Sequence, residues 1–429
     1  METESQISNW RAIEALRAGV PNRDAVRMLG CSQPKIEEHF RQLMSSMTSN
    51  RPEDDTVEGL FVAGDYGCGK SHLLEYLQHL ALENNFICSK IAISKQTTLF
   101  DPSKLYTAAI QSARTPDDYN GLVMERIIQK LKDNKDSPQY ANFFKWLEYS
   151  YFLSSHFAAT VGIAENMQPT TDGIEIINRI SRFWAGDKKI GIGELRKWLG
   201  VVRKTSTYVI DAVKERDLAW QRYHFTPRLI LAAGYSGWII LVDEVESISN
   251  HPLKQRAKSY AQIARLLGKL DDFKIPGLAC VLSISLAYEG EILNERDDES
   301  KILGKLSARP NSEDMLLAGE AEKGIKAIYD ISKKQMILDN VPNMEQLYAK
   351  VAQIHANAYD WNPPNVFQTN HVWRIREHIK RWVNELDLRR LYPEYDPNIT
   401  VDLLQQDLSE RPEFEEDSDE DSQENDANT

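Results

Sequence analysis

Residues 64–71 read GDYGCGKS, which places glycine, lysine and serine at the spacing G-x-x-x-x-G-K-S. This spacing is typical of a loop that binds the phosphates of a nucleotide. Gly64, Gly67 and Gly69 let backbone N–H groups point into a concave anion site, because no Cβ atom obstructs them. The ammonium of Lys70 can contact the β- and γ-phosphates, and the hydroxyl of Ser71 can ligate Mg²⁺. The alternative is a glycine-rich turn that binds nothing.

The sequence on either side of this loop favours phosphate binding. The preceding residues 59–64, GLFVAG, predict a buried strand, and residues 70–84 predict an amphipathic helix. A helix that begins at the lysine directs the partial positive charge of its N-terminus at a bound phosphate. We therefore predict a site for ATP and Mg²⁺, with nucleotide-contacting residues Gly64, Asp65, Tyr66, Gly67, Cys68, Gly69, Lys70, Ser71 and His72.

A second acidic motif supplies the chemistry that the loop lacks. Residues 238–247, WIILVDEVES, begin as a buried strand and end in Asp243 and Glu244. We predict that Asp243 holds Mg²⁺ together with Ser71, and that Glu244 is the general base for the attacking water. A capping acidic pair at an unrelated strand end is the alternative. The presence of the glutamate favours hydrolysis, with Glu244 and Lys70 as catalytic residues.

Further residues are candidates for contacts with the γ-phosphate. The strand predicted over 278–285, LACVLSIS, ends in Ser283 and Ser285, and Ser283 is our candidate for touching the phosphate or the water. A hydroxyl that simply ends a strand is an equal alternative. Four arginines are candidates for an arginine finger or a sensor, against the alternative of ordinary surface residues: Arg296, Arg309, Arg374 and Arg376.

The remaining patterns predict an α/β P-loop NTPase of AAA+ type, with a parallel sheet, a helical insertion and a helical lid. Strands are predicted over 59–64, 86–94, 238–243 and 278–285, with a possible fifth strand over 334–341. The predicted domains are an N-terminal helical element (1–50), the ATPase core (51–342) with an insertion at about 114–226, the lid (343–408) and a disordered acidic tail (409–429).

Composition limits the protein's class and location. No apolar stretch approaches the roughly 20 residues of a membrane span, and the first residues lack a signal pattern, so we expect a cytoplasmic protein without membrane contact. The four cysteines form no C-x-x-C pair, which argues against a zinc site or a disulfide framework. The net charge is −13, but residues 409–429 carry ten acids and one arginine, so the rest of the chain is nearly balanced.

Two helical segments raise the question of DNA binding. The three short helices predicted over 1–50 could form a helix-turn-helix, but Glu37 and Glu38 make the last one a poor reader of a DNA groove, which favours a packing or docking role. The predicted helix at 370–391 is rich in basic residues and could contact a phosphate backbone. A solvated helix face is the alternative there.

Five blocks of the chain resemble the ATP-binding proteins of bacteriophage-exclusion (BREX) defence systems, of the BrxD type. They lie between about residues 11 and 393: RAIEALRAGVPNRDAVRMLGC, GLFVAGDYGCGKSHLLEYL, AAGYSGWIILVDEVESI, RAKSYAQIARLLG and WVNELDLRRLYP. Many ATPases share the phosphate loop and the acidic strand, whereas the first block and AAGYSGW are distinctive. The resemblance places the phosphate loop of the family on Gly64 to Ser71 and its acidic pair on Asp243 and Glu244.

This resemblance implies a P-loop ATPase related to the origin-recognition branch of AAA+ proteins. It implies a cytosolic protein that acts with other BREX components, namely a large ATPase, a phosphatase-like protein and a helicase. DNA is a further candidate partner. The chain departs from origin-recognition ATPases because only about 16 residues separate LYP at 391–393 from the acidic tail, which leaves no room for a winged helix.

Three functions therefore remain open at this point. The first is an ATPase that drives assembly or remodelling of partners or DNA. One form of this hypothesis is a homo-oligomer in which one subunit supplies an arginine to the nucleotide site of its neighbour. The second is a nucleotide-gated scaffold that does not hydrolyse ATP. The third is a DNA-binding loader of the origin-recognition kind.

Overall fold

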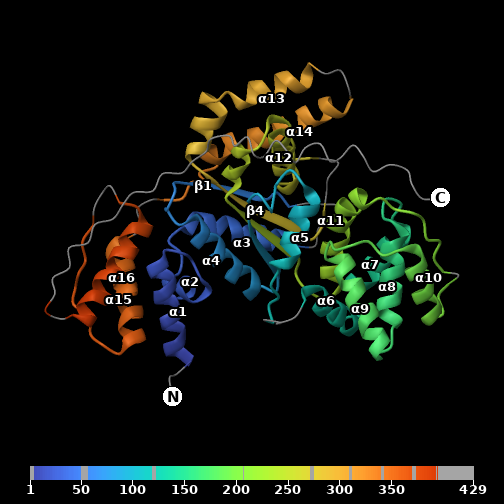
Figure 1. The fold of residues 1–429 in the computed structure, drawn as a ribbon, viewed down its shortest axis with the longest axis horizontal. Helices are drawn as coiled ribbons and strands as arrows, with labels where there is room; N and C mark the ends of the chain where they lie inside the picture. The colour runs from blue at the N-terminus through green and yellow to red at the C-terminus, as the bar shows by residue number, and fades with distance from the viewer. Residues whose placement is uncertain are drawn as a thin grey trace.

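The computed structural model describes residues 4–49, 57–117, 122–205, 207–270, 275–308, 312–339, 343–369, 373–392 and 394. The predicted acidic tail lies outside the described residues. Helices and strands alternate through the first half of the core, and helices predominate elsewhere (Figure 1). The strands are β1 (Leu60–Gly64), β2 (Ile87–Ala92), β3 (Trp238–Asp243) and β4 (Leu278–Ser285).

The four strands form one parallel sheet in the order β1-β4-β3-β2. All residues of β3 and β4 are buried. Burial on both faces explains why these strands read as continuous apolar runs and not as alternating patterns. The four strands predicted from the sequence are confirmed. Parallel pairing also brings the carboxyl ends of β1, β4 and β3 to the same edge of the sheet.

Among the described residues of the fifth strand considered over 334–341, one bridge lies beside β1. Ile337 pairs in parallel with Ala63. The amide of Ala63 donates to the carbonyl of Met336 over 3.0 Å, and the amide of Leu338 donates to the carbonyl of Ala63 over 2.8 Å. The chain therefore runs along the edge of β1 just before the lid begins.

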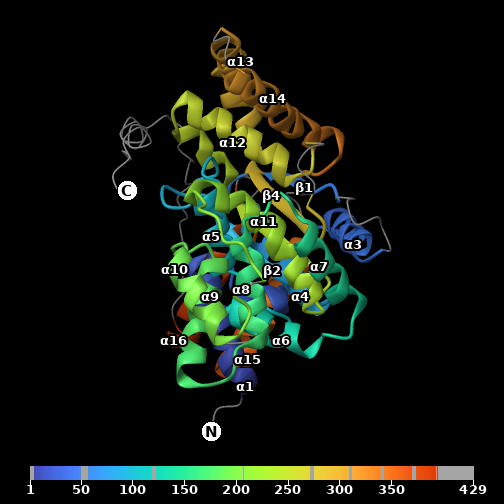
Figure 2. The ribbon, with the colours of Figure 1, turned by 90° about the vertical axis from the view of Figure 1, so that its right-hand side faces the viewer.

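Helices of the core surround this sheet. The helix α4 (Lys70–Glu83) begins at the predicted lysine, and η1 (Val245–Asn250) is a short 3₁₀ helix directly after the acidic pair. A π-helix, η2 (Glu289–Glu295), follows β4 and leads to α13 (Asp298–Ser307) and α14 (Ser312–Lys333), and α14 packs along α12 (Leu253–Leu266) at one end of the molecule (Figure 2). The other core helices are α3 (Pro34–Thr48) and α5 (Pro102–Gln111).

A helical insertion lies at one end of the molecule, between β2 and β3. Side-chain caps mark several of its helix starts: Ser137, for example, accepts from the amide of Tyr140, and Thr170 accepts from the amide of Gly173. The insertion packs a core of aromatic rings that includes Phe157, Phe183 and Trp184. Its helices are α6 (Val123–Asp133), α7 (Pro138–Tyr149), α8 (Ser155–Asn166), α9 (Thr171–Trp184), α10 (Ile192–Val201) and α11 (Glu215–Ala232).

The N-terminal helices divide between two hydrophobic cores. Helix α3 packs on the sheet through Phe40 and Leu43. In contrast, α1 (Glu4–Ala18) and α2 (Arg23–Leu29) share a separate core with the lid helices α15 (Met344–Tyr359) and α16 (Ile375–Leu391), as Figure 1 shows at the left. The described helices of the predicted N-terminal element therefore contribute to two cores, and α1 and α2 share theirs with the helices of the predicted lid. No helix among the described residues is long and apolar enough to cross a membrane.

Candidate nucleotide-binding site

The phosphate loop has the backbone that its glycines predict. Gly67 and Gly69 have φ angles of 79° and 104°, a region that side-chain-bearing residues rarely adopt. Gly69 immediately precedes α4, so the loop feeds directly into the helix N-terminus. Lys70 is only 8% exposed, and its Nζ atom lies 2.8 Å from the carbonyl of Gly64 and 3.1 Å from that of Asp65. These bonds use two of the three donors of the ammonium and hold it across the loop.

The acidic pair lies at the same edge of the sheet as this loop. Asp243 ends β3 and is 7% exposed. Its Oδ1 atom accepts from the hydroxyl of Ser283 over 2.6 Å and from the amide of Glu244 over 3.0 Å. Ser283 is fully buried in β4, so its hydroxyl contacts the predicted metal ligand and does not reach the cavity. The structure therefore places Ser283 against Asp243 and not at the position predicted for a contact with the γ-phosphate.

Glu244 stands at the turn after β3 with a φ of 57°. A left-handed conformation is uncommon for a non-glycine residue and is often found at functional sites. Its side chain is exposed and lines the cavity, yet the surrounding protein removes part of its hydration and so raises the pKa of its carboxyl. The carboxylates of Asp243 and Glu246 raise this pKa further, whereas Lys70 and Arg376 oppose the shift. A raised pKa brings a general base closer to neutral pH.

A third carboxylate lies in the site that the sequence did not indicate. Glu246, on η1, is 2% exposed, and its Oε2 atom accepts from the amide of Ser285 over 3.0 Å. It lines the same cavity as Asp243 and Glu244. The motif DEVES gives no signal for this contact, because only the 3₁₀ geometry of η1 turns Glu246 inward toward the end of β4.

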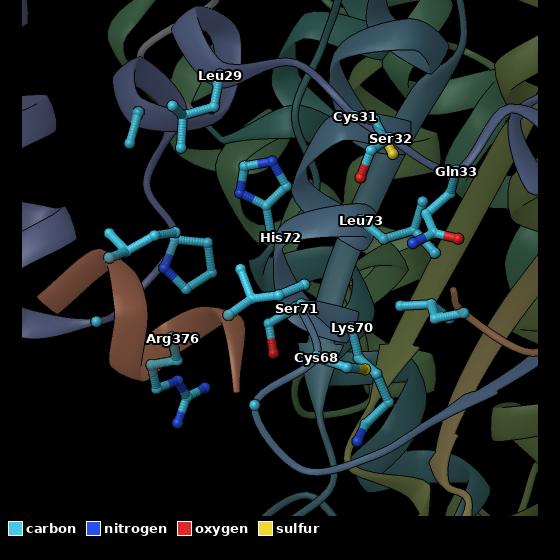
Figure 3. Close-up of a pocket in the computed structure, with 18 of the residues that line it drawn as sticks. Leu29, Cys31, Ser32, Gln33, Cys68, Lys70, Ser71, His72, Leu73 and Arg376 are labelled. Atoms are coloured by element: carbon cyan, nitrogen blue, oxygen red, sulfur yellow. The ribbon is translucent and has the colours of Figure 1, made fainter. Parts of the chain in front are cut away.

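Two predicted lid arginines meet the phosphate loop through Tyr66. The guanidinium carbons of Arg374 and Arg376 lie 5.7 and 5.2 Å from the centre of the Tyr66 ring. The backbone amide of Arg376 also lies 3.4 Å from the carbonyl of Gly67. Arg376 lines the cavity, and Figure 3 shows its side chain on the lid side of the loop, near Ser71. The N-terminus of α16 thus closes directly over the loop.

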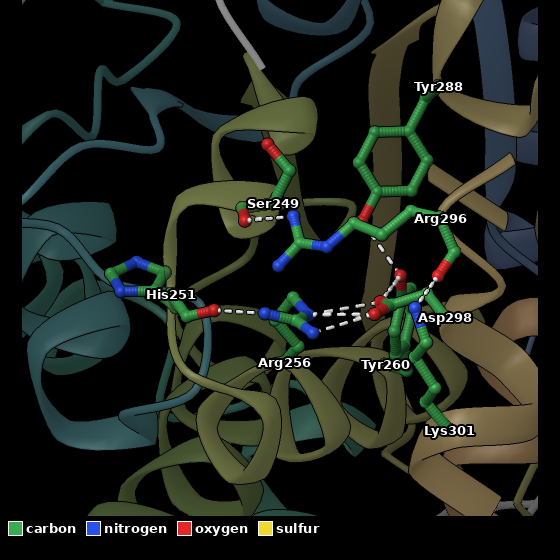
Figure 4. A network of polar contacts seen from close by, with 8 residues as sticks. All are labelled: Ser249, His251, Arg256, Tyr260, Tyr288, Arg296, Asp298 and Lys301. Carbon is green, nitrogen blue, oxygen red and sulfur yellow. Dashed lines mark hydrogen bonds and ion pairs between the residues drawn. The ribbon is translucent and has the colours of Figure 1, made fainter. Parts of the chain in front are cut away.

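The remaining arginine candidates lie elsewhere. Arg296 points inward, and one of its N–H groups donates to the carbonyl of Ser249 over 2.9 Å (Figure 4). It is not among the residues that line the cavity. Its contact instead fixes η1, which begins one residue after Glu244. Arg309 lies outside the described residues.

The cavity around the loop extends into a part of the chain that we did not predict as a site. It encloses about 230 Å³ between the phosphate loop, the acidic turn, the segment joining α1 to α3, and the lid. Much of its apolar wall comes from the α1–α2 segment and the predicted lid: Leu16, Val20, Leu29, Leu347, Ile375 and Ile379. The core adds Leu73 and Leu338. The block RAIEALRAGVPNRDAVRMLGC was the available signal, but its sequence alone does not show that it folds against the lid.

Hydrogen bonds fasten this wall to the core. His72, the third residue of α4, donates from Nε2 to the carbonyl of Gly30 over 2.7 Å, and burial lowers the pKa of its imidazole. The amide side chain of Gln33 makes two reciprocal bonds of 3.0 Å with the backbone of Asp339, one to its carbonyl and one from its N–H. Gln33 therefore joins the segment before α3 to the segment that follows the bridge at Ile337.

The donor set fits a magnesium ion only in combination with phosphate oxygens. Mg²⁺ takes oxygen ligands and usually keeps several waters, with one or two carboxylates and substrate phosphates. Asp243 supplies one nearly buried carboxylate, and Ser71 supplies a hydroxyl in the same cavity. Among the described residues no group of three or more His, Cys, Asp or Glu side chains could hold a metal alone.

A phosphate loop and an acidic strand end at one edge of a parallel sheet define the class: this is an α/β nucleotide-binding protein with a P-loop-like core. A sequence model of the family "BREX system ATP-binding protein BrxC/D" matches residues 8–287, and the chain belongs to this family. The match confirms the resemblance and includes four of the five blocks that carry it. No curated protein and no solved structure shows significant similarity to the chain.

Proposed function

We propose that the protein binds ATP in this cavity and hydrolyses it as part of a BREX defence complex. The observation that carries the proposal is the convergence of Lys70, Glu244 and Arg376 on one cavity from three separate elements. Lys70 neutralises phosphate charge, Glu244 accepts a proton from the attacking water, and Arg376 stabilises charge from the lid side. Asp243 and Ser71 would hold Mg²⁺, which neutralises charge on the β- and γ-phosphates.

The base of the nucleotide has a natural place against the lid. A planar aromatic base needs apolar contact together with a few polar groups. The apolar side chains from α1, α2 and the lid supply the first, and Gln346 and Asn343 line the same cavity. The N-terminal segment would therefore contact the nucleotide and not only pack against the protein.

The proposed architecture is of AAA+ type, with the bridge at Ile337 in the place of a fifth strand and α15–α16 as the lid. In this arrangement ATP drives assembly or remodelling of other BREX components, including the large ATPase, the phosphatase-like protein and the helicase, in the cytoplasm. We further propose that the protein forms a homo-oligomer and that one subunit supplies an arginine to the nucleotide site of its neighbour.

The experiment compares ATP binding and turnover in three variants. Glu244→Gln should retain ATP affinity but lose about 10² to 10⁴ in turnover, because a general base typically contributes that much. Lys70→Ala should weaken ATP binding itself. Glu322→Gln, an exposed glutamate on α14, is the matched control and should leave both quantities unchanged.

Two outcomes separate this proposal from its alternatives. Near-normal turnover in Glu244→Gln would remove the glutamate from the mechanism. Tight ATP binding by the wild-type protein, with no turnover alone or with BREX partners and DNA, would favour the nucleotide-gated scaffold. The presence of the Glu244 carboxylate in the cavity favours hydrolysis over that scaffold.

A further inference from the structure

A strongly basic segment lies in the helical insertion, far from the nucleotide site. Residues 179–204 contain eight basic and two acidic residues, in a chain whose net charge is −13. This segment runs from the last turns of α9 through α10 to the turn that follows it. We call its six exposed cations the basic surface: Arg182, Lys188, Lys189, Arg196, Lys197 and Arg203.

The charges of the basic surface are not neutralised by the protein itself. All six side chains are exposed, and none of them takes part in an ion pair between described residues. The two acids in the segment do not change this. Glu194 lies 3.8 Å from Arg179 and accepts from the amide of Gly191, while Asp187 is exposed. Six unpaired cations in so short a segment make a locally positive field on an acidic protein.

Buried and half-buried arginines hold the segment in one shape. Arg179 donates to the carbonyls of Lys188 and Lys189 over 2.9 and 2.8 Å, which ties the loop to α9. Arg222, fully buried on α11, donates to the carbonyl of Asp187 over 3.1 Å. Trp198 lies on the buried face of α10 and belongs to the core. The cations therefore project from an ordered scaffold.

The chemistry of this surface fits a phosphate backbone better than a protein partner. Protein interfaces rely on buried aromatic and apolar anchors. The aromatic residues of this segment, Phe183, Trp184 and Trp198, are all buried, and Val201 is its one large exposed apolar side chain. Half of the basic surface is arginine, whose guanidinium matches phosphate oxygens in two-point contacts.

The basic side chains of α16, the helix that the sequence suggested for contact with a phosphate backbone, mostly contact other parts of the protein. On α16, Arg381 and Arg389 lie 3.8 and 3.1 Å from Glu385, and Arg390 lies over the ring of Tyr359. Arg376 faces the nucleotide cavity. The lid helix therefore offers far less free positive charge in its described part than the insertion does.

We propose that the basic surface binds the phosphate backbone of a nucleic acid. A ten-residue helix such as α10 is about 15 Å long, and duplex DNA carries about nine phosphate charges over that length. Figure 1 places α10 at the opposite end of the molecule from the lid. A nucleic acid bound there leaves the nucleotide cavity open, so the inference is independent of ATP hydrolysis.

The test measures binding of the full chain to labelled DNA duplex, single-stranded DNA and RNA as a function of salt. The triple variant Arg196→Gln, Lys197→Gln, Arg203→Gln is compared with the control Lys305→Gln, Lys323→Gln, Lys326→Gln, whose lysines are exposed on α13 and α14. Each lost phosphate contact lowers the slope of log affinity against log salt by about 0.9, so the first variant should lose about 2 to 3 from this slope. The control should match the wild type, and ATP binding in both variants confirms that they fold.

The outcomes separate the possible polyanions. Binding to one of the three nucleic acids that weakens only in the first variant supports the proposal and identifies which nucleic acid is bound. No binding to any of them at about 50 mM salt overturns it, as does an equal loss in the control. If poly-glutamate binds through these residues and nucleic acids do not, the surface serves an acidic protein and the proposal is wrong.

Discussion

The buried ion pair between Arg256 and Asp298 allows a quantitative test of how the acidic turn is supported. Asp298 is fully buried at the start of α13, and Arg256 on α12 approaches it with N–O distances of 2.7 and 3.1 Å. The hydroxyl of Tyr260 donates to the same carboxylate over 2.8 Å. Arg256 also donates to the carbonyl of His251, just beyond η1, so the pair anchors the segment that follows Glu244.

Asp298→Ala removes the carboxylate and leaves a buried guanidinium without its counter-charge. Breaking a buried pair in this way typically costs about 3 to 5 kcal/mol of folding stability. That loss is a large part of the roughly 5 to 15 kcal/mol that stabilises a folded domain. The double variant Arg256→Met, Asp298→Leu removes both charges, and we expect it to regain most of the loss because neither desolvated charge remains.

Urea unfolding followed by far-ultraviolet circular dichroism and tryptophan fluorescence measures both variants. Agreement of the two probes establishes whether one transition contains the sheet core. We also expect slower ATP turnover in Asp298→Ala at a temperature where it remains folded, because η1 loses an anchor. A loss below about 1 kcal/mol, or a double variant as unstable as the single one, would refute the view that this pair is a desolvated anchor.

Three further results are expected. Ser283→Ala should weaken magnesium-dependent ATP binding, because its hydroxyl donates to Asp243 and a hydrogen bond to a charged group is worth about 1.5 to 3 kcal/mol. Ser285→Ala is the control, since Ser285 contacts Glu246 through its backbone. Equal effects of the two variants in a Mg²⁺ titration would contradict the role of Ser283. Arg376→Ala should lower ATP affinity by about ten- to a hundredfold, which corresponds to the loss of one hydrogen bond to a charged group. Arg389→Ala should leave ATP affinity unchanged, because the ion-pair partner of Arg389 is Glu385 on the same helix. Calorimetric titration measures both affinities, and an unchanged affinity in Arg376→Ala would exclude Arg376 from the site. Burial lowers the pKa of His224 from 6.5 to about 4, so the histidine is protonated at a higher pH in the unfolded chain than in the folded one. The free energy of unfolding should therefore fall as pH drops from about 6.5 toward 4. His224→Asn should flatten this pH dependence in urea unfolding, and an unchanged pH profile would contradict the role of His224.

The phosphate loop and the acidic pair were predictable because their signals are local. The spacing of Gly64, Gly69, Lys70 and Ser71 encodes a turn, a charge and a helix start within eight residues. The carboxyl ends of parallel strands meet at one edge, so apolar runs that end in acids or serines already imply proximity. The structure adds which of these groups contact each other, and it places Ser283 against Asp243.

The apolar wall of the cavity, formed by the α1–α2 segment and the predicted lid, was not predictable because its contacts join distant parts of the chain. Ile13 and Trp382 share one core, although more than three hundred residues separate them in the sequence. An amphipathic pattern shows that a helix has an apolar face, but not which partner covers it. The inward turn of Glu246 has a similar cause, since it depends on a 3₁₀ turn that the residue types do not specify.

The pair of hydrogen bonds between Gln33 and Asp339 joins two chain segments that lead toward the unit formed by α1, α2, α15 and α16. One segment lies directly before α3 and the other follows the bridge at Ile337, and the amide of Gln33 binds them side by side. Two chain segments held side by side permit bending about the line that joins them, and they resist twisting or sliding. We therefore expect α1, α2, α15 and α16 to bend about this line as one body, because a single hydrophobic core holds these helices together.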